Sequence, residues 1–154
     1  EKYFEGIVPQ PGKLTAADQV LVEGIKKAAT EADEFITKLD FSEGINAIRK
    51  VVDAANLYVT EQEPWTIAKD EANKERLATV LYCVAESLRA IAVLYHAIMP
   101  ESTTKIWNIL GANESIGDIS KQLISNAGTW GILPAGSKVN KGEAVFPRLA
   151  EDEQ

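Results

Sequence analysis

The sequence predicts an all-α fold, an up-and-down helical bundle with an irregular C-terminal tail. Two observations support this prediction. Apolar residues recur every three or four positions over three long segments, at about residues 15–39, 42–62 and 72–99, and this is the rhythm of amphipathic helices. No segment shows the strict alternation of a half-buried strand, and the chain contains no internal repeat.

The first predicted helix has a recognisable start. Thr15 is a good N-cap, and Asp18 three residues later gives the spacing of a capping box, in which the two residues satisfy each other's backbone N–H groups. The residues expected to face inward are Leu21, Ile25, Ala28, Ala32, Phe35 and Leu39.

The second and third predicted helices each show one apolar stripe that is expected to be buried. In the second helix the stripe consists of Phe41, Ile45, Ile48, Val52, Ala55 and Val59. In the third it consists of Leu77, Val80, Leu81, Val84, Leu88, Ile91, Tyr95 and Ile98. A polar stripe also runs along the second helix towards Pro64 and Trp65, and its members are Asn46, Arg49, Asp53, Asn56 and Thr60.

The remaining sequence predicts shorter elements. Pro100 ends the third helix, and a helix of about residues 100–110 is closed by Gly111 in the left-handed conformation. Another short helix is expected from Ser115 to about Ser125. The glycines and prolines after residue 126 predict an irregular segment. We therefore expect residues 1–126 to form the bundle and residues 127–154 to pack back on its core.

Composition narrows the classes of function. The 154 residues allow one domain with a real core. The net charge of −7 argues against gripping nucleic acid through the whole surface, so an RNA contact must use local patches and stacking. No uninterrupted apolar run reaches the roughly 20 residues of a membrane span, and neither a membrane nor DNA is an expected partner. The single cysteine, Cys83, excludes an intramolecular disulfide and fits the cytoplasm. Because the first residue is Glu1 rather than Met, we expect a piece of a longer protein.

The strongest candidate for a binding site is the break after the second predicted helix. Pro64 cannot continue a helix, and Trp65 follows it directly at a corner. Lys69 lies one helical turn further on the same side, and an aromatic ring beside a cation suits an unstacked base and its phosphate. On chemistry alone, Trp65 packed in the core is the more common arrangement. Arg49, Lys50 and Lys69 are candidate phosphate contacts, although a solvated helix face is the default for such residues.

The same residues resemble a known family. The pattern of Asn56, Tyr58, Pro64, Trp65 and Lys69 resembles the anticodon-binding domain of bacterial-type methionyl-tRNA synthetases. Three further stretches resemble these enzymes in the right order: residues 2–9 (Lys-Tyr-Phe-Glu-Gly-Ile-Val-Pro), residues 99–107 (Met-Pro-Glu-Ser-Thr-Thr-Lys-Ile-Trp) and residues 146–148 (Phe-Pro-Arg).

The resemblance implies a function for the candidate site. The family's tryptophan stacks on an anticodon base, so Trp65 would be the stacking residue and Asn56 would help to shape the site. The implied partners are the CAU anticodon loop of tRNA and the catalytic domain of the same enzyme. The family's helix with an Asn-x-x-x-Arg motif would precede Glu1.

The resemblance also implies that this chain is inactive alone. The family uses ATP with Mg²⁺ in its catalytic domain, and the signatures His-Ile-Gly-His and Lys-Met-Ser-Lys-Ser that handle ATP are absent from this sequence. No cofactor is therefore expected in this chain. His96 has no second ligand at metal-binding spacing, Cys83 has no histidine partner nearby, and no isolated carboxylate pair suggests acid–base catalysis.

One alternative from another class stays open at this point. The chain could be a non-catalytic helical module that docks a partner helix in an apolar groove. The negative charge fits that interpretation better. A solvent-accessible Trp65 ringed by cations would favour RNA, whereas a buried Trp65 beside a long apolar groove elsewhere would favour docking.

Overall fold

The computed structural model describes residues 3–147 and confirms the predicted all-α class. The helices in chain order are α1 (Ala16–Thr37), α2 (Phe41–Gln62), α3 (Pro64–Ile67), the 3₁₀ turn η1 (Glu71–Asn73), α4 (Lys74–Tyr95), α5 (Pro100–Ile109), α6 (Ala112–Ser115), the 3₁₀ turn η2 (Ile119–Lys121) and α7 (Ile124–Ala127). Within the described residues the β-type pairing is one isolated antiparallel bridge between Ile7 and Lys138. Glu1, Lys2 and residues 148–154, including Arg148 of the Phe-Pro-Arg stretch, lie outside the described part.

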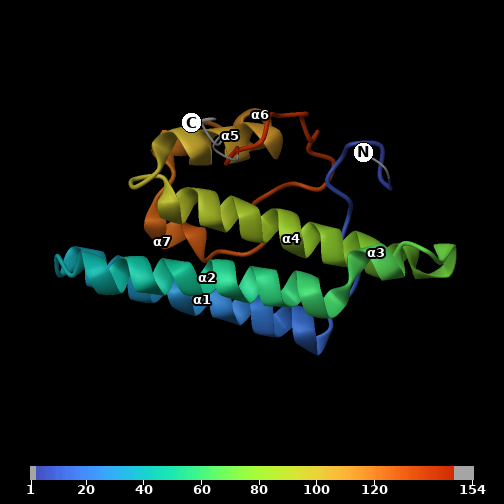
Figure 1. Ribbon diagram of the computed structural model, residues 1–154, viewed down its shortest axis with the longest axis horizontal. Coiled ribbons are helices and arrows are strands. Elements are labelled where there is room, and N and C mark those ends of the chain that lie inside the picture. Colours follow the sequence, from blue (N-terminus) through green and yellow to red (C-terminus); the bar gives the residue numbers. More distant parts are fainter. Residues whose placement is uncertain (1–2, 148–154) are drawn as a thin grey trace, which may run out of the picture.

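The bundle is built around α4. The antiparallel pair α1 and α2 lies on one side of α4 and runs roughly alongside it, and α5 and α6 lie on the other side (Figure 1). Small side chains bring α1 and α2 close together: Ala32 of α1 and Ala47 of α2 are fully buried, and a Cβ added at Gly44 would lie 2.9 Å from the Ile36 side chain. The close approach of two backbones needs small residues at these positions.

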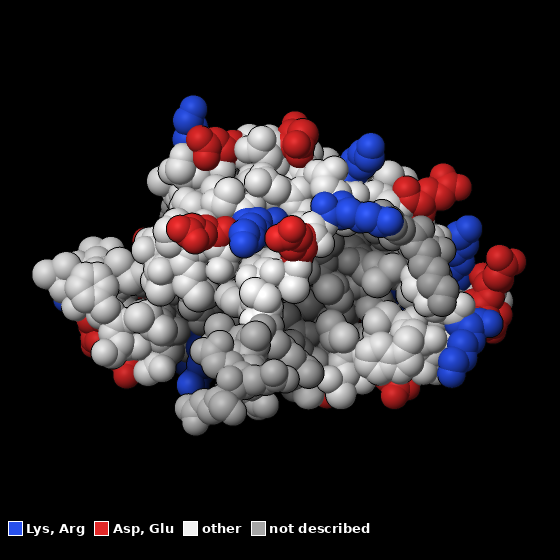
Figure 2. Space-filling model, turned by 45° about the horizontal axis from the view of Figure 1, so that its top comes forward, with Lys and Arg blue, Asp and Glu red and all other residues white. Residues whose placement is uncertain are grey.

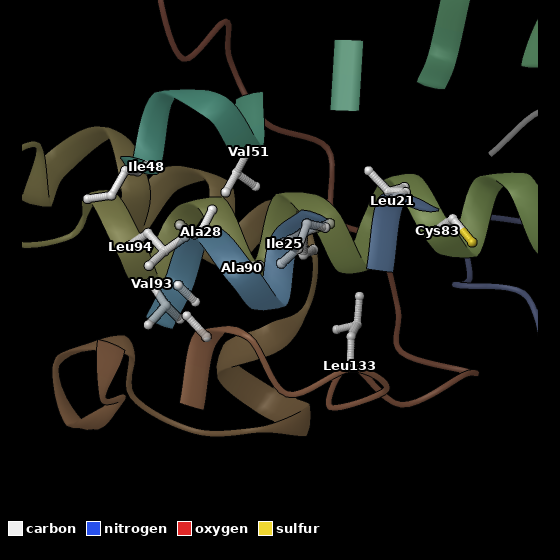
Figure 3. Packing of buried hydrophobic residues seen from close by; sticks show 14 of the residues in the cluster. Leu21, Ile25, Ala28, Ile48, Val51, Cys83, Ala90, Val93, Leu94 and Leu133 are labelled. Atoms are coloured by element: carbon white, nitrogen blue, oxygen red, sulfur yellow. The ribbon is translucent and has the colours of Figure 1, made fainter. Parts of the chain in front are cut away.

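Side chains from all the long helices meet in one core (Figure 3). The core residues labelled there are Leu21, Ile25 and Ala28 of α1, Ile48 and Val51 of α2, Cys83, Ala90, Val93 and Leu94 of α4, and Leu133 of the C-terminal segment. The helical stretch Glu71–Tyr95 is long and apolar enough to cross a membrane by length and composition, but 72% of its apolar window is buried inside the protein. This burial is typical of the core helix of a bundle.

The carboxylate of Asp18 joins three helices at one end of the bundle. Its oxygens accept hydrogen bonds from the Arg76 guanidinium at 2.6 and 2.8 Å, from the Tyr58 hydroxyl at 2.5 Å, and from the N–H and hydroxyl of Thr15 at 2.8 and 3.0 Å. Arg76 also donates to the side-chain oxygen of Gln62 at 2.5 Å. The start of α1, the end of α2 and the start of α4 are thereby tied together, and we call these five residues the Asp18 cluster.

Ionisation of Asp18 is strongly favoured in this cluster. Burial opposes the charged carboxylate, but the hydrogen bonds from Arg76, Tyr58 and Thr15 outweigh burial and lower its pKa to about 2 from an ordinary 3.8. Burial, together with the hydrogen bond to Asp18, raises the pKa of Tyr58, so its hydroxyl stays protonated as a donor.

A second buried charged pair fixes the C-terminal segment to α4. Glu86 accepts hydrogen bonds from the backbone N–H groups of Gly131, Ile132 and Leu133 at 3.0–3.1 Å and from Arg89 at 2.9 Å. The Arg89 guanidinium donates in turn to the carbonyl oxygens of residues 127 and 129, both at 2.9 Å. Buried charges are tolerated where each is paired and hydrogen-bonded. This pair supplies hydrogen-bond partners for backbone groups that an irregular segment cannot pair within itself.

The predicted buried faces of α2 and α4 were partly wrong. On α2, Phe41 and Ile45 are exposed, and the buried residues are Gly44, Ala47, Ile48, Val51 and Tyr58. On α4, Leu88 is 37% exposed, whereas Glu86 and Arg89 are buried, and Ile98 lies exposed beyond the helix. The physical reason is that the true inner faces include small and paired charged residues, which apolar periodicity does not count. Part of the predicted stripes instead lines a surface groove.

Two predicted boundaries also needed correction. Leu39 lies beyond the end of α1 in a left-handed conformation and is exposed rather than inward-facing. The short helix expected from Ser115 to Ser125 is broken into α6, η2 and α7, because Gly117 has a φ of 111° and residues 122 and 123 are extended. The Thr15–Asp18 capping box and the left-handed Gly111 are confirmed. A Cβ at Gly111 would lie 2.1 Å from the Lys138 carbonyl oxygen, so only glycine allows that approach.

The Asp18 cluster leads to a stability prediction. Asp18→Asn should lower the free energy of unfolding by about 3 kcal/mol near neutral pH, because it breaks a buried, bidentate ion pair. The folded pKa of about 2 lies below the unfolded value of 3.8, so the carboxylate's contribution, about 2 kcal/mol, is complete above about pH 5 and is lost as the pH falls through 3.8 towards 2. Urea unfolding at both ends of this range measures the effect. The gap between wild type and variant should narrow in acid, and a constant gap would contradict this account.

Candidate nucleic-acid interface

The corner between α2 and α3 presents Trp65 to solvent. Glu63 follows the last residue of α2 in a left-handed conformation with φ 43°, and Pro64 then begins α3. The amide of Thr66 donates to the Glu63 carbonyl at 2.7 Å, which closes the new turn. Ile67 packs against the core, whereas Trp65 is 53% exposed. Ile67 thus helps to anchor the short helix, which leaves a large aromatic ring accessible, as predicted.

The other predicted site residues lie at different distances from this ring. Asn56 and Lys69 are exposed, and Lys69 directly follows the α3 turn. Arg49 and Lys50 are also exposed, but they precede the end of α2 by 12 residues or more, which is about 18–20 Å along a helix. The ammonium of Lys50 pairs with Glu31 of α1 at 3.3 Å. Lys69 therefore follows Trp65 within four residues, whereas Arg49 and Lys50 lie towards the other half of α2.

The charge around Trp65 is not a ring of cations. Residues 61–76 contain acidic residues at positions 61, 63, 70, 71 and 75 and basic residues at positions 69, 74 and 76. Of the basic residues, Arg76 is engaged by Asp18. Over the face shown in Figure 2, Lys and Arg side chains are interspersed with Asp and Glu and form no basic patch. A ligand at this corner would be held by stacking and hydrogen bonds more than by charge.

An apolar groove lies between α2, α4 and α5. Its cavity is about 390 Å³, and its lining includes Val52, Ala55, Asn56, Val59, Val84, Leu88, Ile91, Tyr95, Met99, Ser102, Thr103, Ile106 and Phe146. Asn56 is the polar residue that α2 contributes to this wall. Burial raises the pKa of the Tyr95 hydroxyl, which lies within electrostatic range of Arg49 and Asp53. The sequence did not predict the position of this groove. Its walls come from three segments, and the apolar periodicity assigned their residues to the core.

Cys83 and His96, for which the sequence suggested no chemistry, have structural contacts, and so does Trp107. Cys83 is fully buried, and burial raises the pKa of its thiol to about 11, which suppresses the nucleophilic thiolate. The ring Nδ1 of His96 lies 2.9 Å from the Thr103 hydroxyl. Trp107 is buried, and its indole N–H donates to the Gly117 carbonyl at 2.8 Å. None of these groups adds chemistry to the candidate interface.

The fold and the corner define a helical binding module with an exposed aromatic surface, and comparison with known proteins identifies its family. The family model for the anticodon binding domain of methionyl tRNA ligase matches residues 8–154. The chain belongs to this family, as the resemblance predicted.

Relatives and solved structures agree with that assignment. A methionine–tRNA ligase of Streptomyces coelicolor is 48% identical over 97% of this chain, and one of Caldanaerobacter subterraneus subsp. tengcongensis is 37% identical over 97%. Among solved structures, apo methionyl-tRNA synthetase of Mycobacterium tuberculosis is similar with a TM-score of 0.82 and 30% identity over 96% of this chain. Another structure of the Mycobacterium tuberculosis enzyme is bound by methionyl-adenylate.

The match covers only part of each relative. The chain spans 28% and 22% of the two ligases and 29% of the apo synthetase. It therefore corresponds to the anticodon-binding module of such enzymes, and the larger share of each relative has no counterpart in these 154 residues.

Proposed function

We propose that this chain binds the anticodon loop of a tRNA, with the Trp65 ring as the surface on which an anticodon base stacks. The observation that supports this most directly is the 53% exposure of Trp65 at the α2–α3 corner of a domain that belongs to the anticodon-binding family. A singly exposed apolar side chain is ordinary by itself, so the proposal rests on this exposure together with the family to which the domain belongs. Single-stranded loop bases can be splayed out and stacked on such a ring.

The proposal assigns different roles to the polar residues. In this proposal Asn56 would help to shape the site and would offer its amide to the base. Lys69 is the candidate phosphate contact beside Trp65. Arg49 and Lys50 would contact phosphates only of RNA that continues about 20 Å along α2, and Lys50 would first have to leave Glu31. Discrimination for the CAU anticodon would come from hydrogen bonds, because a wrong base leaves buried polar groups unpaired.

The proposed parent protein is a methionine–tRNA ligase of the cytoplasm that attaches methionine to its tRNA. ATP and Mg²⁺ would be bound by its catalytic domain, because neither nucleotide signature is present in these 154 residues. The proposed partners of this chain are tRNA and that catalytic domain, with no role for DNA or a membrane. We also propose the division into a bundle of residues 1–126 and a C-terminal segment of residues 127–154 that packs back on it.

The apolar groove supports a second, compatible proposal, which is the helix-docking alternative in a specific form. We propose that the groove seats a helix of the parent protein that precedes residue 1. The walls formed by Val52, Val59 and Leu88 are apolar and partly exposed, which suits the apolar face of a helix. The relatives hold more than two thirds of their length outside the matched part, so such a segment is available in proteins of this family.

Substitution of Trp65 tests the main proposal in the intact parent. Trp65→Ala should reduce kcat/KM for tRNA charging by about 10- to 100-fold, because one base–aromatic stack is worth roughly 1–3 kcal/mol. Methionine activation, measured as ATP–pyrophosphate exchange, should stay unchanged because the ring lies outside the catalytic domain. Trp65→Phe should retain part of the charging activity, since a smaller ring still stacks.

Phe41→Ala is the matched control for this experiment. Phe41 is 57% exposed at the opposite end of α2. Its substitution therefore removes an exposed aromatic ring of similar accessibility but leaves the corner unchanged. It should leave both reactions unchanged. Equal losses of charging and activation in Trp65→Ala would mean that Trp65 serves folding and not recognition.

The isolated chain should have no ligase chemistry. Purified residues 1–154 should catalyse neither ATP–pyrophosphate exchange nor aminoacylation, because no nucleotide signature is present. The radioactive exchange assay with methionine measures this directly, and the intact parent at equal concentration is the positive control. Methionine-dependent exchange by the fragment would refute the assignment of catalysis to another domain.

The groove proposal predicts that stability depends on the preceding segment. A fragment extended to include that segment should resist urea better and bind less of a hydrophobic dye than residues 1–154. Leu88→Glu should reverse both gains in the extended fragment but cost less stability in the short one, because Leu88 is 37% exposed there and a docked helix would cover it fully. Leu123→Glu, at a 60% exposed leucine outside the groove, should be neutral in both. If Leu88→Glu has the same effect in both fragments, the segment does not occupy the groove.

A further inference from the structure

We propose that Gln62 is a positioning residue for the anticodon-binding corner: its side-chain oxygen, held by Arg76, fixes where α2 ends and hence where Trp65 stands. This inference rests on the proposed function for its consequence in tRNA charging. The structural part of the inference, that Gln62 fixes the corner, depends only on the hydrogen bonds and backbone conformation at the corner.

The corner is unfavourable by itself and needs an external anchor. Glu63 adopts φ 43° and ψ 61°, a left-handed conformation that is unfavourable for a residue with a side chain. Glu63 also precedes Pro64, and the residue before a proline prefers extended backbone. Trp65 comes two residues after this strained position. Without an anchor, the chain would relax at Glu63 and the indole would lose its fixed place.

The Arg76–Gln62 hydrogen bond is the anchor next to the strained residue. Gln62 is the last residue of α2, and its side-chain oxygen accepts from Nη2 of Arg76 at 2.5 Å. Arg76 belongs to the first turn of α4, so the bond joins the two long helices directly across the corner that α3 spans. A hydrogen bond with one charged partner is stronger than a neutral one.

The guanidinium that holds Gln62 is itself held rigidly. Nη1 and Nη2 of Arg76 bind the two oxygens of Asp18 at 2.6 and 2.8 Å, which is the bidentate geometry that a planar guanidinium favours. Asp18 is fully buried and is fixed in turn by Tyr58 and Thr15. Gln62 and Arg76 thus connect the corner that carries Trp65 to the start of α1 and to the core of the bundle.

Gln62 is the informative residue to change because it forms only the last link. Replacing Asp18 or Arg76 would break the buried ion pair and endanger the fold. Gln62→Met removes the acceptor and keeps the length of the side chain, while the Asp18–Arg76 pair remains. Gln62→Glu keeps an acceptor for Arg76 and should restore the link.

The test measures backbone exchange and both half-reactions in the intact parent protein. In Gln62→Met, hydrogen exchange at the amides of residues 66–68, which close the α3 turn, should accelerate about tenfold, the effect of losing one hydrogen bond to a charged group. Amides of the α4 core should be unaffected. Charging kcat/KM should fall several-fold with methionine activation unchanged, and Gln62→Glu should return exchange and charging to near the wild-type values.

Gln122→Met is the matched control. Gln122 is also half-buried and uses its side-chain amide in one hydrogen bond, to the Asp118 carbonyl at 3.1 Å, in a part of the chain away from the corner. It should change neither exchange at residues 66–68 nor charging.

The outcomes separate this inference from the proposed function. Unchanged exchange at residues 66–68 in Gln62→Met, or equal behaviour of the Met and Glu variants, overturns the positioning role. A loss of charging in Trp65→Ala but not in Gln62→Met also overturns it. If Gln62→Met loosens the corner and neither it nor Trp65→Ala affects charging, Gln62 still positions the corner, and the anticodon role of Trp65 is what fails.

Discussion

The buried carboxylate of Asp18 is the constraint on which the end of the bundle with the α2–α3 corner depends. It satisfies the start of α1, accepts both arms of Arg76 from α4 and receives the Tyr58 hydroxyl from α2. Removing a carboxylate from water is costly, and that cost is offset here because every lone-pair direction is used by a donor. Apolar packing alone would allow the helices to slide or rotate slightly. A bidentate ion pair allows one geometry. It therefore fixes the helices relative to one another, and with them the corner that follows α2.

The Glu86–Arg89 pair solves a different problem in the same way. Residues 128–147 form no regular helix, so their backbone groups cannot satisfy one another, yet Leu133 of this segment is fully buried in the core. Glu86 accepts three consecutive amides of the segment, and Arg89 donates to two of its neighbouring carbonyls. Charged side chains projecting from a central helix therefore replace the secondary structure that the segment lacks. This is why α4 can be apolar enough to pass for a membrane span and still contain two buried charges.

The sequence predicted the three long helices and the exposed corner because each depends on local rules. The capping box of Thr15 and Asp18, the helix break at Pro64 and the left-handed Gly111 are all set by residues within a few positions of one another. The inner faces of α2 and α4 and the link from Gln62 to Arg76 depend on residues far apart in the chain. Periodicity treats Glu86 and Arg89 as solvent-facing, and no spacing rule connects residue 18 to residue 76. The proposed role of Trp65 comes from the family resemblance, because its chemistry alone favoured a place in the core.

Within the proposed function, the groove and the corner use the same helix for two purposes. Asn56 lies on the α2 wall of the groove, between Val52 and Val59, and it precedes the corner by less than two turns of helix. A helix seated in the groove would therefore place its own side chains beside Asn56 and near the approach to Trp65. Docking and RNA binding then cease to be competing interpretations. On this proposal the apolar wall would hold the partner helix, Asn56 would meet the base, and the corner beyond would supply the stacking surface. A domain with a net charge of −7 can bind RNA on these terms, because affinity comes from a preorganised aromatic and hydrogen-bonding site and not from a general attraction to phosphate.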